Sequence, residues 1–250
     1  MQEWGEGPPL VCVHGLGGDA SFFSGLGPAL ADHCRTIAVD LPGCGRSPAV
    51  PAVSFDLAAS ILVDLARHES GQALSVLGHS MGTIVALEAA RQAPDLIRSL
   101  VLVGGLPEPR DASRARIAER IDRIRREGLA GVGEQAASAN FARVTRIGRP
   151  DVTSAFARAF EAQSAEDYIA WAEALCGWRA RPLPSLEHVP CLVITGEEDQ
   201  YAPPDAVREF GQALPAGTRI EVMADCGHLP FLEQPLEFAA LVGTFLDSGK

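Results

Sequence analysis

The sequence predicts an α/β protein with a mostly parallel, open sheet of about six strands and a helical segment inserted into it. Short apolar runs alternate with longer amphipathic stretches along most of the chain. Most of these runs are continuously apolar, which is typical of parallel strands covered on both faces. The alternation stops between about residues 107 and 186, where the pattern is helical throughout.

The elements follow in order along the chain. Six runs are expected as strands: Leu10–Val13, Thr36–Val39, Leu74–Leu77, Leu100–Val103, Cys191–Thr195 and Arg219–Met223. Five stretches between or after them are expected as helices: Ala20–Asp32, Phe55–Glu69, Met81–Gln92, Pro204–Leu214 and Leu236–Leu246. A regular strand–helix alternation predicts crossover connections, and therefore a doubly wound sheet.

The helical stretch is too long to be a loop of a compact domain, so we expect a separate insertion. The predicted core is then 1–106 together with 187–250, and the insertion is 107–186. The first half of the insertion is basic, in a chain of net charge −11. Its ten arginines are Arg110, Arg114, Arg116, Arg120, Arg123, Arg125, Arg126, Arg143, Arg146 and Arg149. Either they form a solvated helix face, or one or two of them meet an anionic substrate.

Composition excludes several kinds of chemistry. The single lysine is the last residue, Lys250, which rules out an internal Schiff-base lysine, a pyridoxal phosphate anchor and a P-loop. The acidic net charge argues against nucleic-acid and anionic-membrane partners. The apolar runs are far shorter than the roughly 18–20 residues of a membrane span, and the start shows no signal peptide. Six dispersed cysteines without a CxxC pair indicate a reduced, cytoplasmic protein without a bound metal.

A glycine-rich turn after the first run admits a nucleotide-binding interpretation. Gly15-Leu-Gly17-Gly-Asp-Ala20 follows a predicted strand, and Asp40 ends the next strand twenty residues later. This resembles the dinucleotide-binding pattern with its ribose-binding acid, although an alanine stands at the third glycine position. A nicotinamide-dependent oxidoreductase therefore remains an alternative at this point.

A second motif indicates a nucleophile. Gly78-His79-Ser80-Met81-Gly82 joins a predicted strand to a predicted helix. A serine on such a sharp corner needs small neighbours, and it projects above the sheet at a helix N-terminus. Activation of the serine needs a base and an orienting acid, and the order serine, acid, histidine is the one to look for.

Candidates for both partners follow two later strands. Glu197, Glu198 and Asp199 come after the strand that begins at Cys191, and Asp225 and His228 come after the last strand. These positions lie at the carboxyl edge of the sheet, where open α/β sheets place their sites. Of the other histidines, His14 is expected to brace the loop that follows it, and His79 to point away from the reaction.

Five motifs in this order resemble the α/β-hydrolase fold superfamily. They are His14-Gly-Leu-Gly-Gly18, Asp40-Leu-Pro-Gly43-Cys-Gly45-Arg-Ser47, Gly78-His-Ser-Met-Gly82, Gly196-Glu-Glu-Asp199 with Pro203, and Gly227-His228 with Glu233-Gln-Pro235. The resemblance implies Ser80 as nucleophile, His228 as base and Asp199 as orienting acid. It also implies an oxyanion hole from the N–H groups of Leu16 and Met81, no cofactor, and a cap formed by 107–186.

Within the superfamily the chain is most similar to 3-oxoadipate enol-lactonases and to carboxylesterases. The similarity to the lactonases lies in the stretch Arg123–Val132, in Asn140-Phe141 and in Ala165-Glu-Asp-Tyr168. It implies a substrate that bears a carboxylate, with Arg123, Arg126, Arg143 and Tyr168 as its binding residues. Relatives begin with an additional antiparallel hairpin. Either the sheet edge is bare here, which invites pairing in a homodimer, or the start codon has been placed too late.

The predicted function is that of a serine hydrolase which cleaves a small ester or lactone through an acyl-enzyme. A hydrolase of carbon–carbon bonds in meta-cleavage products is the main alternative. A nicotinamide oxidoreductase and a non-catalytic binding protein are more remote. The expected partner is a small-molecule ester or lactone, with no nucleic acid and no membrane.

Overall fold

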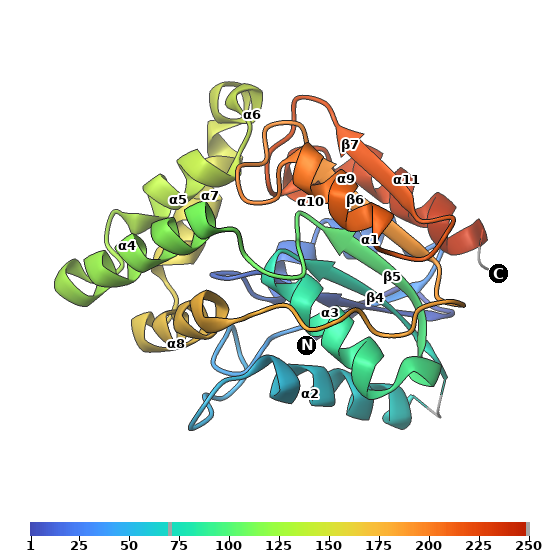
Figure 1. Ribbon diagram of the computed structural model, residues 1–250. Coiled ribbons are helices and arrows are strands. Elements are labelled where there is room, and N and C mark those ends of the chain that lie inside the picture. Colours follow the sequence, from blue (N-terminus) through green and yellow to red (C-terminus); the bar gives the residue numbers. More distant parts are fainter. Residues whose placement is uncertain (70–71, 249–250) are drawn as a thin grey trace.

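A computed structural model describes residues 1–69 and 72–248, so Lys250 lies outside the described residues (Figure 1). Its sheet has seven strands in the spatial order β1-β3-β2-β4-β5-β6-β7. The strands are β1 (Gln2–Trp4), β2 (Pro9–Val13), β3 (Arg35–Val39), β4 (Leu74–His79), β5 (Ile97–Val103), β6 (Cys191–Gly196) and β7 (Arg219–Met223). Every neighbouring pair from β3 to β7 is parallel, which confirms the predicted open and mostly parallel sheet.

The sheet has one strand more than the six runs that the sequence indicates, because β1 pairs antiparallel with β3 at the edge of the sheet. This strand has three residues, of which only Trp4 is a large hydrophobe, so it leaves no apolar run in the sequence. Its pairing depends on backbone hydrogen bonds and on the packing of Trp4. The Trp4 ring lies directly against Gly27, where an added Cβ would be 2.2 Å from the ring.

Strand order places a topological switch between β2 and β4. The chain leaves β2 toward β3 on one side, and leaves β4 toward β5 on the other. Right-handed crossovers in opposite directions put the connecting helices on opposite faces of the sheet. The loops after β2 and β4 therefore separate at the carboxyl edge, where open α/β sheets bind their ligands.

Helices cover both faces of the sheet (Figure 1). α2 (Phe55–His68) and α3 (Met81–Gln92) pack together on one face, and α1 (Leu26–Ala29) packs with α11 (Pro235–Ser248). α9 (Pro204–Gln212) packs on β6 and β7, and α10 (Pro230–Glu233) precedes α11. A short 3₁₀ helix, η2 (Pro94–Leu96), follows α3.

One predicted helix is broken. The stretch Ala20–Asp32 forms a 3₁₀ turn, η1 (Ala20–Phe23), followed by the single turn of α1. Gly25, Gly27 and Pro28 lie in this stretch, and glycine and proline are the residues least favourable to a continuous helix. Its start is capped by the Asp19 side chain, which accepts a hydrogen bond from the Ser21 N–H at 2.7 Å.

Five helices separate β5 from β6 and form a lobe beyond the sheet, the green to yellow part of Figure 1. They are α4 (Asp111–Glu127), α5 (Val132–Asn140), α6 (Arg143–Gly148), α7 (Pro150–Glu161) and α8 (Ala165–Gly177). Within the lobe, α4 packs on α8 and α5 packs on α7. We call residues 107–186 the insertion. Every one of them is described and none is in a strand, as the sequence predicts.

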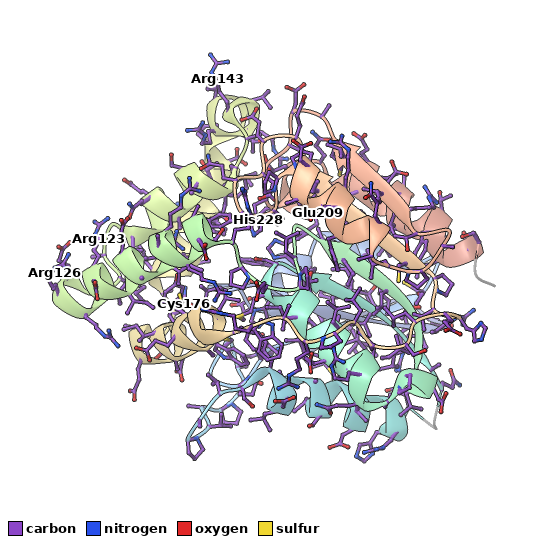
Figure 2. The ribbon with its side chains drawn as sticks, in the orientation of Figure 1. Arg123, Arg126, Arg143, Cys176, Glu209 and His228 are labelled. Carbon is purple, nitrogen blue, oxygen red and sulfur yellow. The ribbon has the colours of Figure 1, made fainter. Side chains whose placement is uncertain are left out.

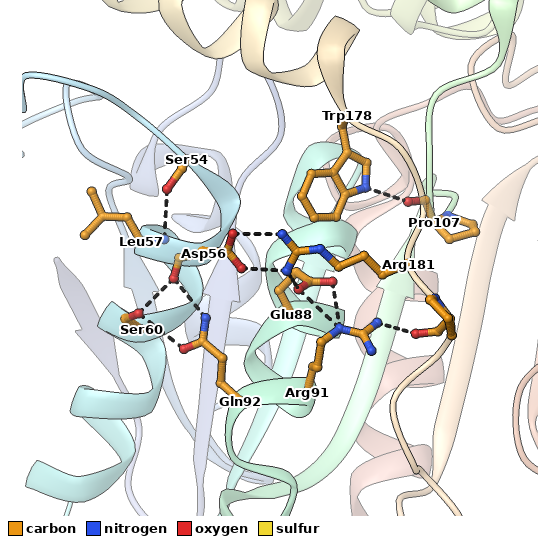
Figure 3. A network of polar contacts seen from close by, with 11 residues as sticks. Ser54, Asp56, Leu57, Ser60, Glu88, Arg91, Gln92, Pro107, Trp178 and Arg181 are labelled. Atoms are coloured by element: carbon orange, nitrogen blue, oxygen red, sulfur yellow. Dashed lines mark hydrogen bonds and ion pairs between the residues drawn. The ribbon is translucent and has the colours of Figure 1, made fainter.

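A cluster of charged residues fastens the returning end of the insertion to the core (Figure 3). Arg181 donates to both carboxylate oxygens of Asp56 at 2.7 and 2.9 Å and to Glu88 at 2.7 Å. Glu88 is buried in α3 and also pairs with Arg91. The Arg181 guanidinium stacks over Trp178, 4.9 Å from the ring centre. These contacts hold the chain after α8 against α2 and α3.

None of the helices in the described part of the chain is both long and apolar enough to span a membrane.

Candidate active site

Ser80 lies on the sharp corner between β4 and α3. Its backbone has φ 53° and ψ −114°, a left-handed conformation that is strained for a residue with a side chain. The Ser80 N–H donates to the carbonyl oxygen of Val103 on β5 at 2.8 Å, which ties the corner to the neighbouring strand. Strain of this kind survives only where the surroundings fix the backbone, and here it lifts the Ser80 side chain out of the sheet.

The two glycines of the motif allow this corner to form. A Cβ at Gly78 would lie 2.4 Å from the carbonyl oxygen of Gly82, and a Cβ at Gly82 would lie 2.4 Å from that of Val13. Both contacts are with backbone atoms that have no room to move. The small residues at both positions are therefore required by the close approach of β4, α3 and β2.

His228 and Asp199 meet in loops after β7 and β6. The His228 Nδ1 lies 2.8 Å from Asp199 Oδ2, and both side chains are buried. An ionised carboxylate only accepts, so the hydrogen-bond pattern places the proton of the imidazole on Nδ1 and leaves the Nε2 lone pair free. This is the tautomer that a general base needs.

Asp199 is held in the ionised state by its surroundings. Burial by itself would raise its pKa, but His228 and hydrogen bonds to the carboxylate bring the pKa below its ordinary value. Its Oδ1 accepts the N–H groups of Tyr201 and Ala202 at 2.8 and 3.0 Å. The rival acids lie elsewhere: Glu197 and Glu198 are exposed and accept hydrogen bonds from other backbone N–H groups.

The loop after β2 is braced by His14, as expected. The Leu41 N–H donates to His14 Nε2 at 3.1 Å, so Nδ1 carries the proton and donates to the carbonyl oxygen of Gly15 at 2.9 Å. Burial lowers the pKa of His14, which keeps the ring neutral. Leu16, two residues after His14, lines the same cavity as Met81. The N–H of Met81 begins α3 and has no acceptor within the helix.

His79 does not point away from the site, contrary to the expectation from sequence. It lines the cavity, and its Nε2 donates to the backbone carbonyl oxygen of His228 at 2.9 Å. The two imidazole rings lie 4.8 Å apart. Burial and the neighbouring His228 lower the pKa of His79 to about 3, so this ring is neutral near pH 7.

One cavity contains these groups. Ser80, His228, Leu16 and Met81 all line it, and its volume is about 740 Å³ with the solvent at its mouth included. Much of the remaining wall is apolar and comes from core and insertion alike: Phe22, Ile84, Leu106, Ile117, Phe156, Phe160, Leu175 and Leu229.

The structure does not bring Arg123, Arg126 and Arg143 to this cavity, which corrects their expected role in substrate binding. Arg126 and Arg143 are exposed at the outer ends of the insertion, well away from His228 (Figure 2). Arg123 bonds to Glu127 at 3.2 Å and to Gln135 at 3.0 Å. Arginines that are close together in the sequence can lie on different sides of their helices. The side chains of these three point toward solvent or toward other helices.

Tyr168 is buried but lies behind the cavity wall. Its hydroxyl accepts a hydrogen bond from Arg120 at 3.1 Å, and its ring packs against that of Phe160 at 5.2 Å. The predicted binding residue therefore supports the wall instead of lining it.

Sequence reasoning assigned no role in the site to three further residues. Arg120 and Tyr201 line the cavity, and Arg120 donates to the Tyr201 hydroxyl at 3.1 Å. The spacing along the helix could have identified Arg120. At 100° per residue, its side chain points only about 60° away from that of the buried Ile117, whereas the side chain of Arg126 points to the opposite side of the helix.

The third residue, Glu233, fastens the insertion to the histidine loop. Its Oε1 accepts the N–H of Gly227 at 2.8 Å, while its Oε2 accepts the N–H of Ala142 at 2.8 Å and the hydroxyl of Thr145 at 2.7 Å. Burial raises the pKa of Glu233, against the opposing effect of these hydrogen bonds. Next to Gly227, the His228 N–H donates to the carbonyl oxygen of Asn140 in the insertion at 2.7 Å.

Protein side chains fill the space next to the glycine-rich turn. A Cβ at Gly15 would lie 2.8 Å from the Ser80 Cβ, and a Cβ at Gly17 would lie 2.5 Å from the Phe160 ring. Asp40, the candidate ribose ligand, accepts the Ala20 N–H at 2.8 Å and the Arg46 N–H at 3.3 Å. The pattern thus brings the turn close to Ser80. Among the described residues no group of three or more His, Cys, Asp or Glu side chains is arranged to hold a metal ion.

Comparisons with known proteins agree with this architecture. A family model described as alpha/beta hydrolase fold matches residues 8–235. A pimeloyl-[acyl-carrier protein] methyl ester esterase of Neisseria meningitidis is 31% identical over 258 residues, covering 96% of this chain and 93% of its own.

Two solved structures are similar over nearly the whole chain. An enol-lactonase of Burkholderia xenovorans has a TM-score of 0.88 at 25% identity, covering 98% of this chain and 95% of its own. An esterase of Thermogutta terrifontis has a TM-score of 0.87 at 24% identity, covering 99% and 92%. The methyl ester esterase of Neisseria meningitidis and the enol-lactonase support hydrolase activity. With its family match, strand order and corner serine, the chain belongs to the α/β hydrolase fold family.

Proposed function

We propose that the protein is a serine hydrolase that cleaves a small ester or lactone through an acyl-enzyme. The observation that carries the proposal is that Ser80 and His228 line one cavity and that Asp199 is bonded to His228. Ser80 sits on a strained corner, His228 lines the same cavity, and Asp199 holds the Nδ1 of His228 at 2.8 Å. The similarity to an esterase and an enol-lactonase favours this reaction class.

In the proposed reaction, His228 Nε2 removes the hydroxyl proton of Ser80 as the oxygen attacks the ester carbonyl. The N–H groups of Leu16 and Met81 stabilise the oxyanion. The imidazolium then protonates the leaving alcohol, and water activated by His228 releases the acid. Asp199 stays ionised and stabilises the imidazolium. Each donor of such an oxyanion hole contributes about 3–4 kcal/mol to transition-state stabilisation.

In this proposal the core consists of 1–106 and 187–250, and the insertion is a cap that supplies one wall of the cavity. Phe156, Phe160 and Ile117 of the insertion line the cavity together with core residues such as Phe22 and Ile84. An apolar wall excludes water from the reacting groups, which strengthens the electrostatic interactions between them.

The test is turnover of a series of aryl esters and lactones by the wild type and by Ser80→Ala. The variant is expected to lose at least a thousand-fold in kcat, and an active-site fluorophosphonate is expected to label Ser80. Ser24→Ala, at an exposed serine, is the matched control and should retain wild-type rates. Labelling of another residue, or esterase activity that survives in Ser80→Ala, contradicts the proposal.

A further inference from the structure

Arg120 lies at the cavity wall without a carboxylate partner. Of its five N–H donors, one bonds to the Tyr168 hydroxyl and one to the Tyr201 hydroxyl, each at 3.1 Å. The guanidinium carbon lies 5.9 Å from the centre of the Phe160 ring. Among the described residues no carboxylate forms an ion pair with Arg120, and three phenol or phenyl rings surround it instead.

These rings do not neutralise the charge. A guanidinium stays protonated in proteins, because its pKa lies above about 12. Burial raises the pKa of Tyr168 above its ordinary value, so that phenol remains neutral. The one acidic side chain among the cavity residues is Glu108, which lies 3.5 Å from Arg114 and accepts the Ala180 N–H at 2.8 Å. Glu108 is therefore engaged elsewhere, and Arg120 keeps a full positive charge at an otherwise largely apolar wall.

The position of Arg120 relates it to the reacting groups. Tyr201 accepts its hydrogen bond at one end, and the ring of the same tyrosine lies 4.8 Å from the ring of His228. The guanidinium is thus one tyrosine side chain away from the proposed general base. The two tyrosines hold two corners of the planar fork, which fixes its orientation at little further entropic cost when a ligand binds.

From this placement we infer that Arg120 binds a carboxylate of the substrate, so that the preferred substrates are esters or lactones that carry a second, free carboxylate. This inference rests on the proposed function for the identity of the reacting group. A carboxylate matches the planar fork through paired hydrogen bonds. Its single charge balances that of Arg120, whereas a doubly charged phosphate would leave an uncompensated charge against an apolar wall.

The test compares two esters that differ in one group: mono-p-nitrophenyl adipate, which ends in a carboxylate, and p-nitrophenyl hexanoate, which ends in a methyl group. The wild type is expected to favour the adipate ester in kcat/KM. Arg120→Gln should lower kcat/KM for the adipate ester by about 30-fold or more, mainly through KM, and should lower it far less for the hexanoate ester. Arg120→Lys keeps the charge and should restore part of the preference.

Arg126→Gln is the matched control, because it removes one arginine from the opposite side of α4 and should leave the ratio of the two esters unchanged. Melting temperatures of all variants establish that they are folded. If Arg120→Gln lowers turnover of both esters by the same factor, or if the wild type shows no preference, Arg120 has a structural role only and the inference fails.

A binding measurement separates this inference from the proposed function. Adipate itself should bind the wild type and Ser80→Ala in calorimetry, and should bind Arg120→Gln at least ten-fold more weakly. Persistent esterase activity in Ser80→Ala would overturn the proposed function while leaving this comparison intact. Equal adipate affinity of the wild type and Arg120→Gln would overturn the carboxylate site while leaving the esterase intact.

Discussion

His79 donates its Nε2–H to the backbone carbonyl oxygen of His228 at 2.9 Å, so the residue before the proposed nucleophile holds the backbone of the proposed base. Its Nδ1 is buried and has no hydrogen-bond partner in the described structure. The contact links β4 to the loop after β7, strands that are three positions apart in the sheet. The Nε2–H donates whether or not the ring is protonated, so in acid the second proton would go to the buried Nδ1, where no acceptor meets it.

Stability is therefore expected to fall in acid. Burial lowers the pKa of His79 to about 3 and lowers that of His14 as well, so the unfolded chain binds more protons than the folded one below about pH 6.5. His79 then costs up to about 1.4 kcal/mol of unfolding free energy per pH unit as the pH falls from about 6.5 toward 3, and His14 acts in the same direction. Urea unfolding at a series of pH values measures this slope.

His79→Gln tests the assignment of this effect. Glutamine retains a donor for the His228 carbonyl oxygen but does not titrate, so the variant should show a shallower loss of stability between pH 6.5 and 4. An unchanged slope would show that other groups cause the acid sensitivity.

Glu233→Gln should loosen the connection between the insertion and the histidine loop. If the amide nitrogen replaces Oε2, it presents a donor to the Ala142 N–H and the Thr145 hydroxyl; in the flipped orientation it faces the Gly227 N–H. Leaving buried donors unsatisfied should cost about 2 kcal/mol of unfolding free energy and also reduce kcat/KM for esters. Chemical denaturation and ester hydrolysis measure the two effects. Glu237→Gln, at an exposed position on α11, is the control and should change neither.

Gly15→Ala should impair catalysis more than stability. The new Cβ would lie 2.8 Å from the Ser80 Cβ and 2.9 Å from the His79 Nδ1, so the serine must shift from its position. A displacement of this size should lower kcat at least ten-fold and slow labelling by a fluorophosphonate. Gly25→Ala provides the comparison, because its Cβ would meet nothing within 4 Å. Equal kcat in the two variants would show that the serine is not confined as the distances indicate.

The charged cluster at the return of the insertion makes a separate prediction. Arg181→Gln leaves the buried Glu88 with Arg91 as its remaining ion-pair partner, and it removes the stacking on Trp178. Because Arg181 is partly exposed, the expected loss is modest, about 1–2 kcal/mol of unfolding free energy, and smaller at high salt. Arg208→Gln removes an exposed pair with Asp205 and should leave the free energy of unfolding almost unchanged. Urea unfolding at low and high salt distinguishes the two.

The sequence by itself determined the architecture of this protein and the identity of the residues at the sheet edge. A continuous apolar run such as Leu10–Val13 is typical of a strand in a parallel sheet. Both faces of such a sheet are covered by helices, so the side chains on both sides of the strand are buried and apolar. The corner around Ser80 is likewise local: its glycines, its strand and its helix are contiguous in the chain, so their pattern is visible without tertiary information. Strand β1 escaped detection because its three residues depend on pairing with β3.

Tertiary structure decided which arginine faces the cavity. Ten arginines share the first half of the insertion, and charge alone does not distinguish Arg120 from Arg123 or Arg126. Their roles depend on which side of α4 packs toward the sheet, and that is set by contacts with α8 and with the core, far away in sequence. The same holds for His79 and Glu233. Their partners, the carbonyl of His228 and the N–H of Ala142, are 149 and 91 residues away, and only the folded chain brings them together.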